Sequence, residues 1–547
     1  MHQDSEAARG KAGRWRRAVR APAVQAAAVG LLAGIVFLAV YGIRFRELLD
    51  PSAMQQAQLG RELAEGRGYT TKVLTPLDLY FDRTVRGRVE VATPPLGPLV
   101  LALSFRLFGA SDGSAALASG VAYVLSVVAA WALGRRLASP AVGWMAAAVY
   151  GLSATATFAS VSGTPVALAA LLVTLALGWA LAGAQVPADA EAAPPTWHAN
   201  AWCAASGGAL GLSVLTESFL LPLAVPLILF VRSRHRARWR RLALWFAIGL
   251  IVPTAPWVVR NWVHTGSPLF STRQYALVER TWTWPGRVVY QDLTWRTAWP
   301  VALAVRRPMD LVRKVGRDLA GERSSVAGAT EFVVGGLLIG LLLLTSRDPT
   351  RRALHLTVVG AFALQALVGA LFTPATILFA CLLPAASVVV ADRVLDLTRE
   401  LDPAPSRHQA AARTALPAGL VLLIVIPTLG RLCAGPEQRH HSDAAAALKA
   451  TLPRDALVMT DVPWFVAWYT GRPAIELCRT DEQFDTISDN VARIDAVYFS
   501  ADPLDPERWP FAERGNWWGM ACNWRGSFKN LLRVPPPVPG AVLRVRG

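Results

Sequence analysis

The hydrophobic positions of the chain gather in long runs, and short polar segments rich in arginine separate these runs. A run of about 20 apolar residues is what an α-helix needs to cross a bilayer. The pattern therefore predicts an α-helical polytopic membrane protein with about eleven transmembrane helices. The predicted spans are 22–43, 114–134, 141–160, 165–184, 199–215, 218–232, 241–259, 328–345, 354–372, 374–393 and 416–434.

One apolar segment, Pro94–Gly109, is shorter than these spans and contains Arg106. Its length is marginal for a bilayer. If it crossed the membrane, basic loops later in the chain would fall on the side opposite the basic N-terminus. We therefore interpret it as a juxtamembrane or re-entrant helix.

The arginines predict the orientation in the membrane. "KAGRWRRAVR", "GRRLASP", "RSRHRARWRR" and "SRDPTRR" all lie on one side if the N-terminus is cytoplasmic, which the positive-inside rule favours. Segments 44–113, 260–327 and 435–547 are then outside the cytoplasm. We expect a multi-pass protein of a bacterial cytoplasmic (inner) membrane, with its functional site where these outer segments meet the bilayer.

Composition agrees with the membrane class. Hydrophobic residues make up 53% of the 547 residues and charged residues only 17%, against about 25% charged in soluble proteins. The formal net charge of +17 does not indicate nucleic-acid binding, because the arginines sit in short loops where topology explains them. None of the five cysteines lies in a metal-ligand spacing. Cys478 and Cys522 can pair if the tail faces an oxidising compartment.

The polar tail has a different pattern. It alternates stretches typical of helices, such as "HSDAAAALKATLP", with stretches typical of strands, such as "DALVMTDV" and "IDAVYFS". This alternation predicts a small extracytoplasmic α/β domain over 435–547, after a transmembrane domain over 1–434.

Four segments carry a family resemblance: "DPSAMQQAQLGRELAEGRGYTT", "TPPLGPLVLALSFRLFGASD", "PWVVRNWVHTGSPLFS" and "VMTDVPWFVAWYTGRPAIEL". In this order they resemble bacterial membrane glycosyltransferases of the GT-C type, of the protein-mannosyltransferase-like and aminoarabinose-transferase-like kinds. The resemblance runs from about Arg14 to Ser500. It implies a site at the outer membrane face, a polyprenyl-phosphate sugar donor, membrane lipid around it, and inverting transfer to a lipid, glycan or protein acceptor. We expect no cofactor.

The chain departs from the family at the positions that carry chemistry. Ser52 and Thr164 occupy the two positions where the family has acidic residues, and Glu217 stands where a basic residue is usual. The loop before the tenth span, "FTPATILF", lacks the usual arginine. Ser and Thr do not act as bases at neutral pH, and they are weak metal ligands, so we expect no metal site. The alternative is a catalytically degenerate relative that binds lipid-linked substrate or a partner.

Asp50, Glu62, Glu65 or Glu217 can supply the carboxylate, because a general base needs reach and a suitable pKa more than one fixed position. Asp50 and Glu217 are the candidates for catalysis, since Glu62 and Glu65 on a polar helix are typically solvated. Asp50 before Pro51 is also typical of a helix cap. The substrate-binding candidates are Arg260, Asn261, Arg61 and Gln55. Guanidinium groups bind phosphate through bidentate hydrogen bonds, although arginines at the ends of spans also extend to lipid headgroups.

Overall fold

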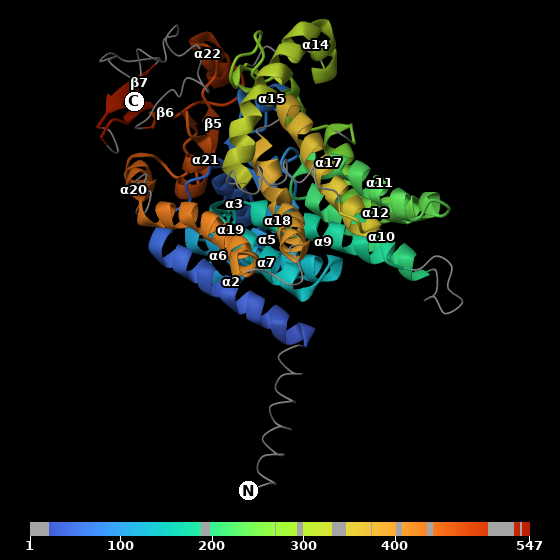
Figure 1. The fold of residues 1–547 in the computed structure, drawn as a ribbon. Coiled ribbons are helices and arrows are strands. Elements are labelled where there is room, and N and C mark those ends of the chain that lie inside the picture. Colours follow the sequence, from blue (N-terminus) through green and yellow to red (C-terminus); the bar gives the residue numbers. More distant parts are fainter. Residues whose placement is uncertain are drawn as a thin grey trace.

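The computed structural model describes residues 21–186, 197–268, 270–292, 299–330, 346–372, 375–400, 407–434, 441–500, 530–535 and 539–546. The predicted basic N-terminal segment and Cys522 lie outside these residues, as does most of the predicted span 328–345. Helices form one large bundle, and a small sheet with its own helices lies at one end of it (Figure 1).

Seven helices are long and apolar enough to cross a membrane, counted over the described residues. They are α2 (Pro22–Arg44), α6 (Asp112–Leu137), α9 (Val166–Ala184), α12 (Trp239–Thr265), α17 (Pro349–Phe372), most of α18 (Ala375–Glu400) and most of α19 (Arg407–Cys433). The protein is a multi-pass membrane protein, as the apolar runs predict. The α18 helix is almost completely buried and forms the centre of the bundle.

Two other predicted spans are divided, and a third forms one helix. The segment 141–160 is divided into α7 (Pro140–Gly151) and α8 (Ala154–Ala159), because Ser153 leaves the helix and caps α8 through the Ala156 amide. The segment 218–232 begins as the 3-10 helix η1 (Ser218–Leu223), which contains Pro222, and continues as α11 (Ala224–Arg234). The segment 199–215 is the helix α10 (Trp197–Val214).

A short layer of two helices lies at the end of the bundle where α2 ends. The polar helix α3 (Pro51–Ala64) packs on the apolar helix α5 (Leu96–Phe108), which is the predicted short helix. Gly60 allows the close approach, because a Cβ atom there would lie 2.9 Å from the Leu101 Cβ. This contact places the start of α3 beside the loops that follow it.

The sheet has six strands in the order β2-β5-β4-β6-β8-β7. Five come from the tail: β4 (Val458–Thr460), β5 (Ala474–Glu476), β6 (Ala496–Phe499), β7 (Leu531–Val534) and β8 (Val542–Arg546). Strands β2, β5, β4 and β6 run parallel to one another, and β8 pairs antiparallel with both β6 and β7. Helices α20 (His441–Thr451) and α22 (Asp481–Asn490) complete the predicted alternation.

The edge strand β2 (Val73–Leu74) belongs to the first outer segment and not to the tail. Val73 pairs with Ala474, and Leu74 pairs with Ile475. Two segments about 400 residues apart thus share one sheet. The same first segment also forms a small ribbon from β1 (Thr70–Thr71) and β3 (Arg88–Val89). The sheet therefore fixes the loops that lie between it and the bundle.

Candidate functional site

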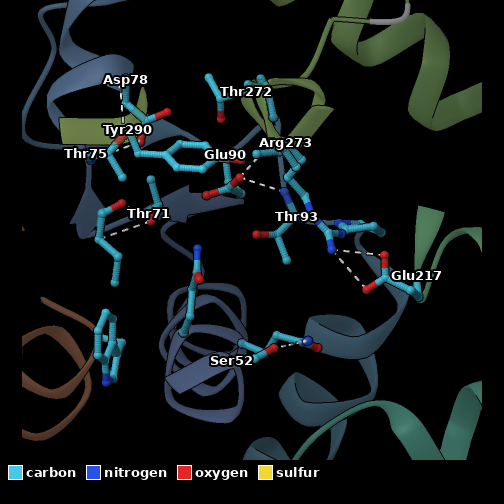
Figure 2. Close-up of a pocket in the computed structure, with 18 of the residues that line it drawn as sticks. Ser52, Thr71, Thr75, Asp78, Glu90, Thr93, Glu217, Thr272, Arg273 and Tyr290 are labelled. Carbon is cyan, nitrogen blue, oxygen red and sulfur yellow. Dashed lines mark hydrogen bonds and ion pairs between the residues drawn. The ribbon is translucent and has the colours of Figure 1, made fainter. Parts of the chain in front are cut away.

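A cavity of about 310 Å³ lies where the first polar segment, the segment after α12, the sheet and the ends of membrane helices meet. Figure 2 shows side chains from these different elements converging on one space. The wall toward the membrane is apolar and contains Phe219, Phe372, Ile377 and Leu378. The rings of Phe219 and Phe372 stack at 5.3 Å between centroids. The other walls are mostly polar and carry both signs of charge.

Arg273 lies next to the apolar wall. Ser271 caps the 3-10 helix η2 (Thr272–Leu277), and this short helix aims Arg273 at the cavity. Its guanidinium lies 3.0 Å from the carboxylate of Glu217 and 5.0 Å from the ring centre of Phe219. Burial alone would lower the pKa of Arg273, but the Glu217 carboxylate outweighs it, so the net shift is upward and the guanidinium stays charged.

Glu90 follows strand β3 and points into the cavity (Figure 2). Its Oε1 atom accepts hydrogen bonds from the backbone amides of Ala92 and Thr93, at 2.7 and 2.8 Å. The described residues provide no hydrogen-bond donor to Oε2. The residue is only 5% exposed, and this burial raises the pKa of Glu90. The cavity thus contains a carboxyl group that is fixed through one oxygen.

Arg260 and Asn261 stand behind Glu90, at the end of α12. Arg260 donates to the Glu90 carbonyl at 2.8 Å, and the Asn261 amide donates to the Val91 carbonyl at 3.1 Å. The Arg260 guanidinium also lies over the ring of Trp257, 4.8 Å from its centre. Neither residue lines the cavity. Together they hold the backbone that presents Glu90.

A tight loop brings two more charged groups to the sheet side of the cavity. The Arg280 amide donates to the Gly286 carbonyl at 3.0 Å, and Arg280 has a φ of 58°, which L-residues seldom adopt. This closed loop places Glu279 and Arg287 in the same wall, opposite Glu476 from the end of β5. Burial raises the pKa of Glu279. Among the described residues, no group of three or more metal-ligating side chains is present.

Three comparisons with known proteins bear on this geometry. The family model described as dolichyl-phosphate-mannose-protein mannosyltransferase matches residues 92–259, which is less than half of the chain. No curated protein matches the chain at a significant level. Solved structures do match along most of its length.

One similar structure is the crystal structure of ArnT from Cupriavidus metallidurans bound to undecaprenyl phosphate. The match has a TM-score of 0.58 and 15% identity, and covers 95% of this chain and 97% of that one. Another is the archaeal oligosaccharyltransferase AglB from Archaeoglobus fulgidus, in complex with an inhibitory peptide and a dolichol-phosphate. Here the TM-score is 0.55 at 11% identity, over 87% of this chain and 69% of that one. The chain has the GT-C glycosyltransferase fold. The resemblance seen in the sequence is thus confirmed at the level of the fold.

Two of the six site residues expected from the sequence, Glu217 and Gln55, line the cavity of this GT-C fold. Asp50 caps α3, and its carboxylate accepts from the amides of Ser52 and Ala53 at 2.8 and 3.1 Å. Arg61 donates to the carbonyls of Trp468 and Ala467, both at 2.8 Å, and so joins α3 to the tail. The roles assigned to these residues, and to Arg260 and Asn261, stay predictions.

The two positions where GT-C relatives have acidic residues lie apart. Ser52 lines the cavity, whereas the Thr164 hydroxyl pairs with that of Ser162 at 2.6 Å and does not line it. Sequence reasoning did not single out Glu90, Arg273, Glu279, Arg287 or Glu476. Their one signal in the sequence is that they are charged residues in predicted outer segments. Nothing local in the sequence shows that they converge.

Proposed function

We propose that the chain is an integral-membrane glycosyltransferase that takes a sugar from a polyprenyl-phosphate donor. The acceptor is a lipid, glycan or protein at the outer face of the cytoplasmic membrane. One observation carries the proposal: the cavity has an apolar wall at the ends of membrane helices and polar walls with opposite charges. A lipid-linked sugar needs this combination, because its tail stays in the bilayer while its head leaves it.

Arg273 is the best-placed group for the donor phosphate. It borders the apolar wall, and its charge is retained. A guanidinium offers paired N–H donors that fit phosphate oxygens. The undecaprenyl phosphate in the ArnT structure and the dolichol-phosphate in the AglB structure support a ligand of this class.

Glu90 is the best-placed general base. In an inverting transfer the acceptor oxygen attacks the anomeric carbon, the bond from that carbon to the phosphate oxygen breaks, and the acceptor proton goes to a carboxylate. The amides of Ala92 and Thr93 fix Glu90 and leave Oε2 for that proton. A pKa raised by burial makes the carboxylate a stronger base. The leaving phosphate stays beside Arg273.

Glu217 and Asp50 remain the alternatives for the base. Both Glu217 oxygens lie 3.0 Å from Arg273, which favours a role in orienting that guanidinium. Asp50 has one oxygen engaged at the helix cap. Variants Glu90→Gln, Glu217→Gln and Asp50→Asn therefore separate the three assignments.

Topology supports the outer face. The cavity lies at the end of α2 that carries Arg44, because α3 begins shortly after that residue and Ser52 lines the cavity. With the N-terminus in the cytoplasm, as the positive-inside rule favours, this end of α2 is outside. The inner membrane and this orientation belong to the proposal.

The test is donor turnover by the full chain in nanodiscs. Polyprenyl-phosphate sugars extracted from the host are added with host membrane acceptors, and free polyprenyl phosphate is followed by mass spectrometry. We expect release by the wild type, loss on Glu90→Gln, and no change on Glu482→Gln, an exposed carboxylate on α22. Release that Glu90→Gln leaves intact would contradict the assignment of the base.

The degenerate alternative keeps one supporting observation, the Ser52 hydroxyl in the cavity where relatives have an acid. It predicts that the wild type binds the lipid-linked sugar and never releases the polyprenyl phosphate. The same mass-spectrometric experiment distinguishes the two functions.

A further inference from the structure

Glu476 and Arg287 face each other across the sheet side of the cavity. Glu476 ends strand β5, and Arg287 follows the closed loop after Glu279. The Glu476 Oε1 atom and the Arg287 Nε atom are 3.5 Å apart. Both atoms are buried, and neither has a hydrogen-bond partner among the described residues. The Glu476 side chain as a whole is only 2% exposed.

Such a pair is poorly satisfied without a third group. A buried donor or acceptor that lacks a hydrogen bond is unfavourable, because it has lost its water. A hydroxyl group satisfies both atoms at once, since it donates to the carboxylate and accepts from the Nε–H group. Both residues line the cavity, so the hydroxyl can belong to a ligand that enters it.

The surroundings of the pair favour one kind of ligand. Glu279 lies in the same wall, so this side of the cavity carries two carboxyl groups beside one guanidinium. Arg273 also lies near two acids, Glu217 and Glu90. The Arg273 side is the one that borders the apolar wall, where a lipid tail enters, so the lipid phosphate belongs there. The Tyr290 ring lies under the Arg287 guanidinium, with 4.8 Å to its centre, and restricts its position. A neutral group with several hydroxyls fits this side best.

We propose that Glu476 and Arg287 form the subsite that binds the hydroxyls of the donor sugar. The inference rests on the proposed function, and it assigns the C-terminal sheet a direct part in choosing the sugar. The lipid phosphate is bound on the Arg273 side, and the sugar extends toward the sheet. The pairing of β2 with β5 keeps Glu476 in register with the first outer segment.

The test compares two kinds of probe bound to the full chain in nanodiscs. The first is polyprenyl phosphate without a sugar. The second is a panel of polyprenyl phosphates that carry mannose, glucose, galactose or arabinose. The quantity measured is the ratio of the two Kd values, sugar-free over sugar-linked, for the sugar that the wild type binds most tightly.

We expect Glu476→Gln to lower this ratio about tenfold, because the sugar then loses one or two good hydrogen bonds. The Kd for the sugar-free lipid should stay the same. Arg287→Lys should act in the same direction, because it keeps the charge and removes the Nε–H group. Glu482→Gln on α22 is the matched control and should change neither Kd.

Other outcomes overturn the proposal. If the variants weaken both lipids equally and lower Tm, the pair is structural only. If Glu476→Gln changes neither Kd, water alone satisfies the two atoms, and the same holds if the wild type binds both lipids equally. A wild type that binds neither lipid removes the proposed function itself, which differs from a failure of the subsite alone.

Discussion

The Glu217 carboxylate and the Arg273 guanidinium lie 3.0 Å apart, although 56 positions separate them in the chain. Glu217 stands where GT-C relatives usually have a basic residue. In this chain a basic group, Arg273, reaches Glu217 from η2, the short helix after α12. Ser52, at a position where the resemblance implies an acid, lines the same cavity into which Glu90 brings a carboxyl group.

Substitutions at Arg273 and Glu217 separate the role of this pair in turnover from its role in stability. We expect Arg273→Ala to lower donor turnover about 10²- to 10³-fold, the size of losing one group that stabilises developing charge. It should also destabilise the protein by roughly 1–3 kcal/mol, because Glu217 is left unpaired with its side chain 14% exposed. Adding Glu217→Gln should restore most of the stability and none of the turnover. Recovery of turnover in the double variant would show that Arg273 does not contact substrate.

Arg260 and Asn261 are expected to act through the position of Glu90. Arg260→Ala and Asn261→Ala each remove a donor to the backbone at Glu90 or Val91, so each should lower kcat with little change in the Kd for polyprenyl phosphate. Arg83→Ala, at an exposed position of the same outer segment, is the control. If Arg260→Ala alone weakens lipid binding, Arg260 contacts the phosphate directly.

Asp50 offers a test of capping against catalysis. Asparagine caps helices about as well as aspartate, whereas alanine costs about 1 kcal/mol at such a position. If capping is the role of Asp50, Asp50→Asn should keep both Tm and turnover, and Asp50→Ala should lower Tm. Turnover that disappears in Asp50→Asn while Tm is unchanged would instead identify Asp50 as the base.

The raised pKa of Glu279 predicts that the stability of the protein depends on pH. Its folded pKa is raised above the ordinary value of 4.5 by burial. Its contribution to stability is therefore present below about pH 4.5 and is lost as the pH rises through the folded pKa, where a charge must be buried. We expect the Tm of the wild type to fall from acid toward neutral pH, and that of Glu279→Gln to fall less.

Glu90 has the same sign of shift, so part of the decline should remain in Glu279→Gln. The measurement is a thermal unfolding series in one detergent across pH 5 to 8, with Glu482→Gln as the control. Parallel profiles for Glu279→Gln and the wild type would refute the assignment.

Features that depend on local sequence could be predicted. Seven of the eleven predicted spans are long apolar helices in the described part of the chain, and the short apolar helix after Pro95 is expected from its length. The Asp50-Pro51 pair signalled a helix start, and Asp50 is the cap. The predicted span 141–160 is instead two helices, α7 and α8, because the Ser153 side chain caps the second one.

The sequence by itself determined that this is a polytopic helical membrane protein with an α/β tail, because hydrophobic runs and strand alternation act over a few neighbouring residues. The resemblance to the GT-C type came from four motifs in order. Only the tertiary structure decided which charges share the cavity. Glu90, Arg273, Arg287 and Glu476 come from three separate outer segments, and no periodicity relates them. Their convergence depends on contacts between distant segments, such as β2 with β5 and Arg260 with Glu90. Long-range packing, and not local pattern, therefore built the site.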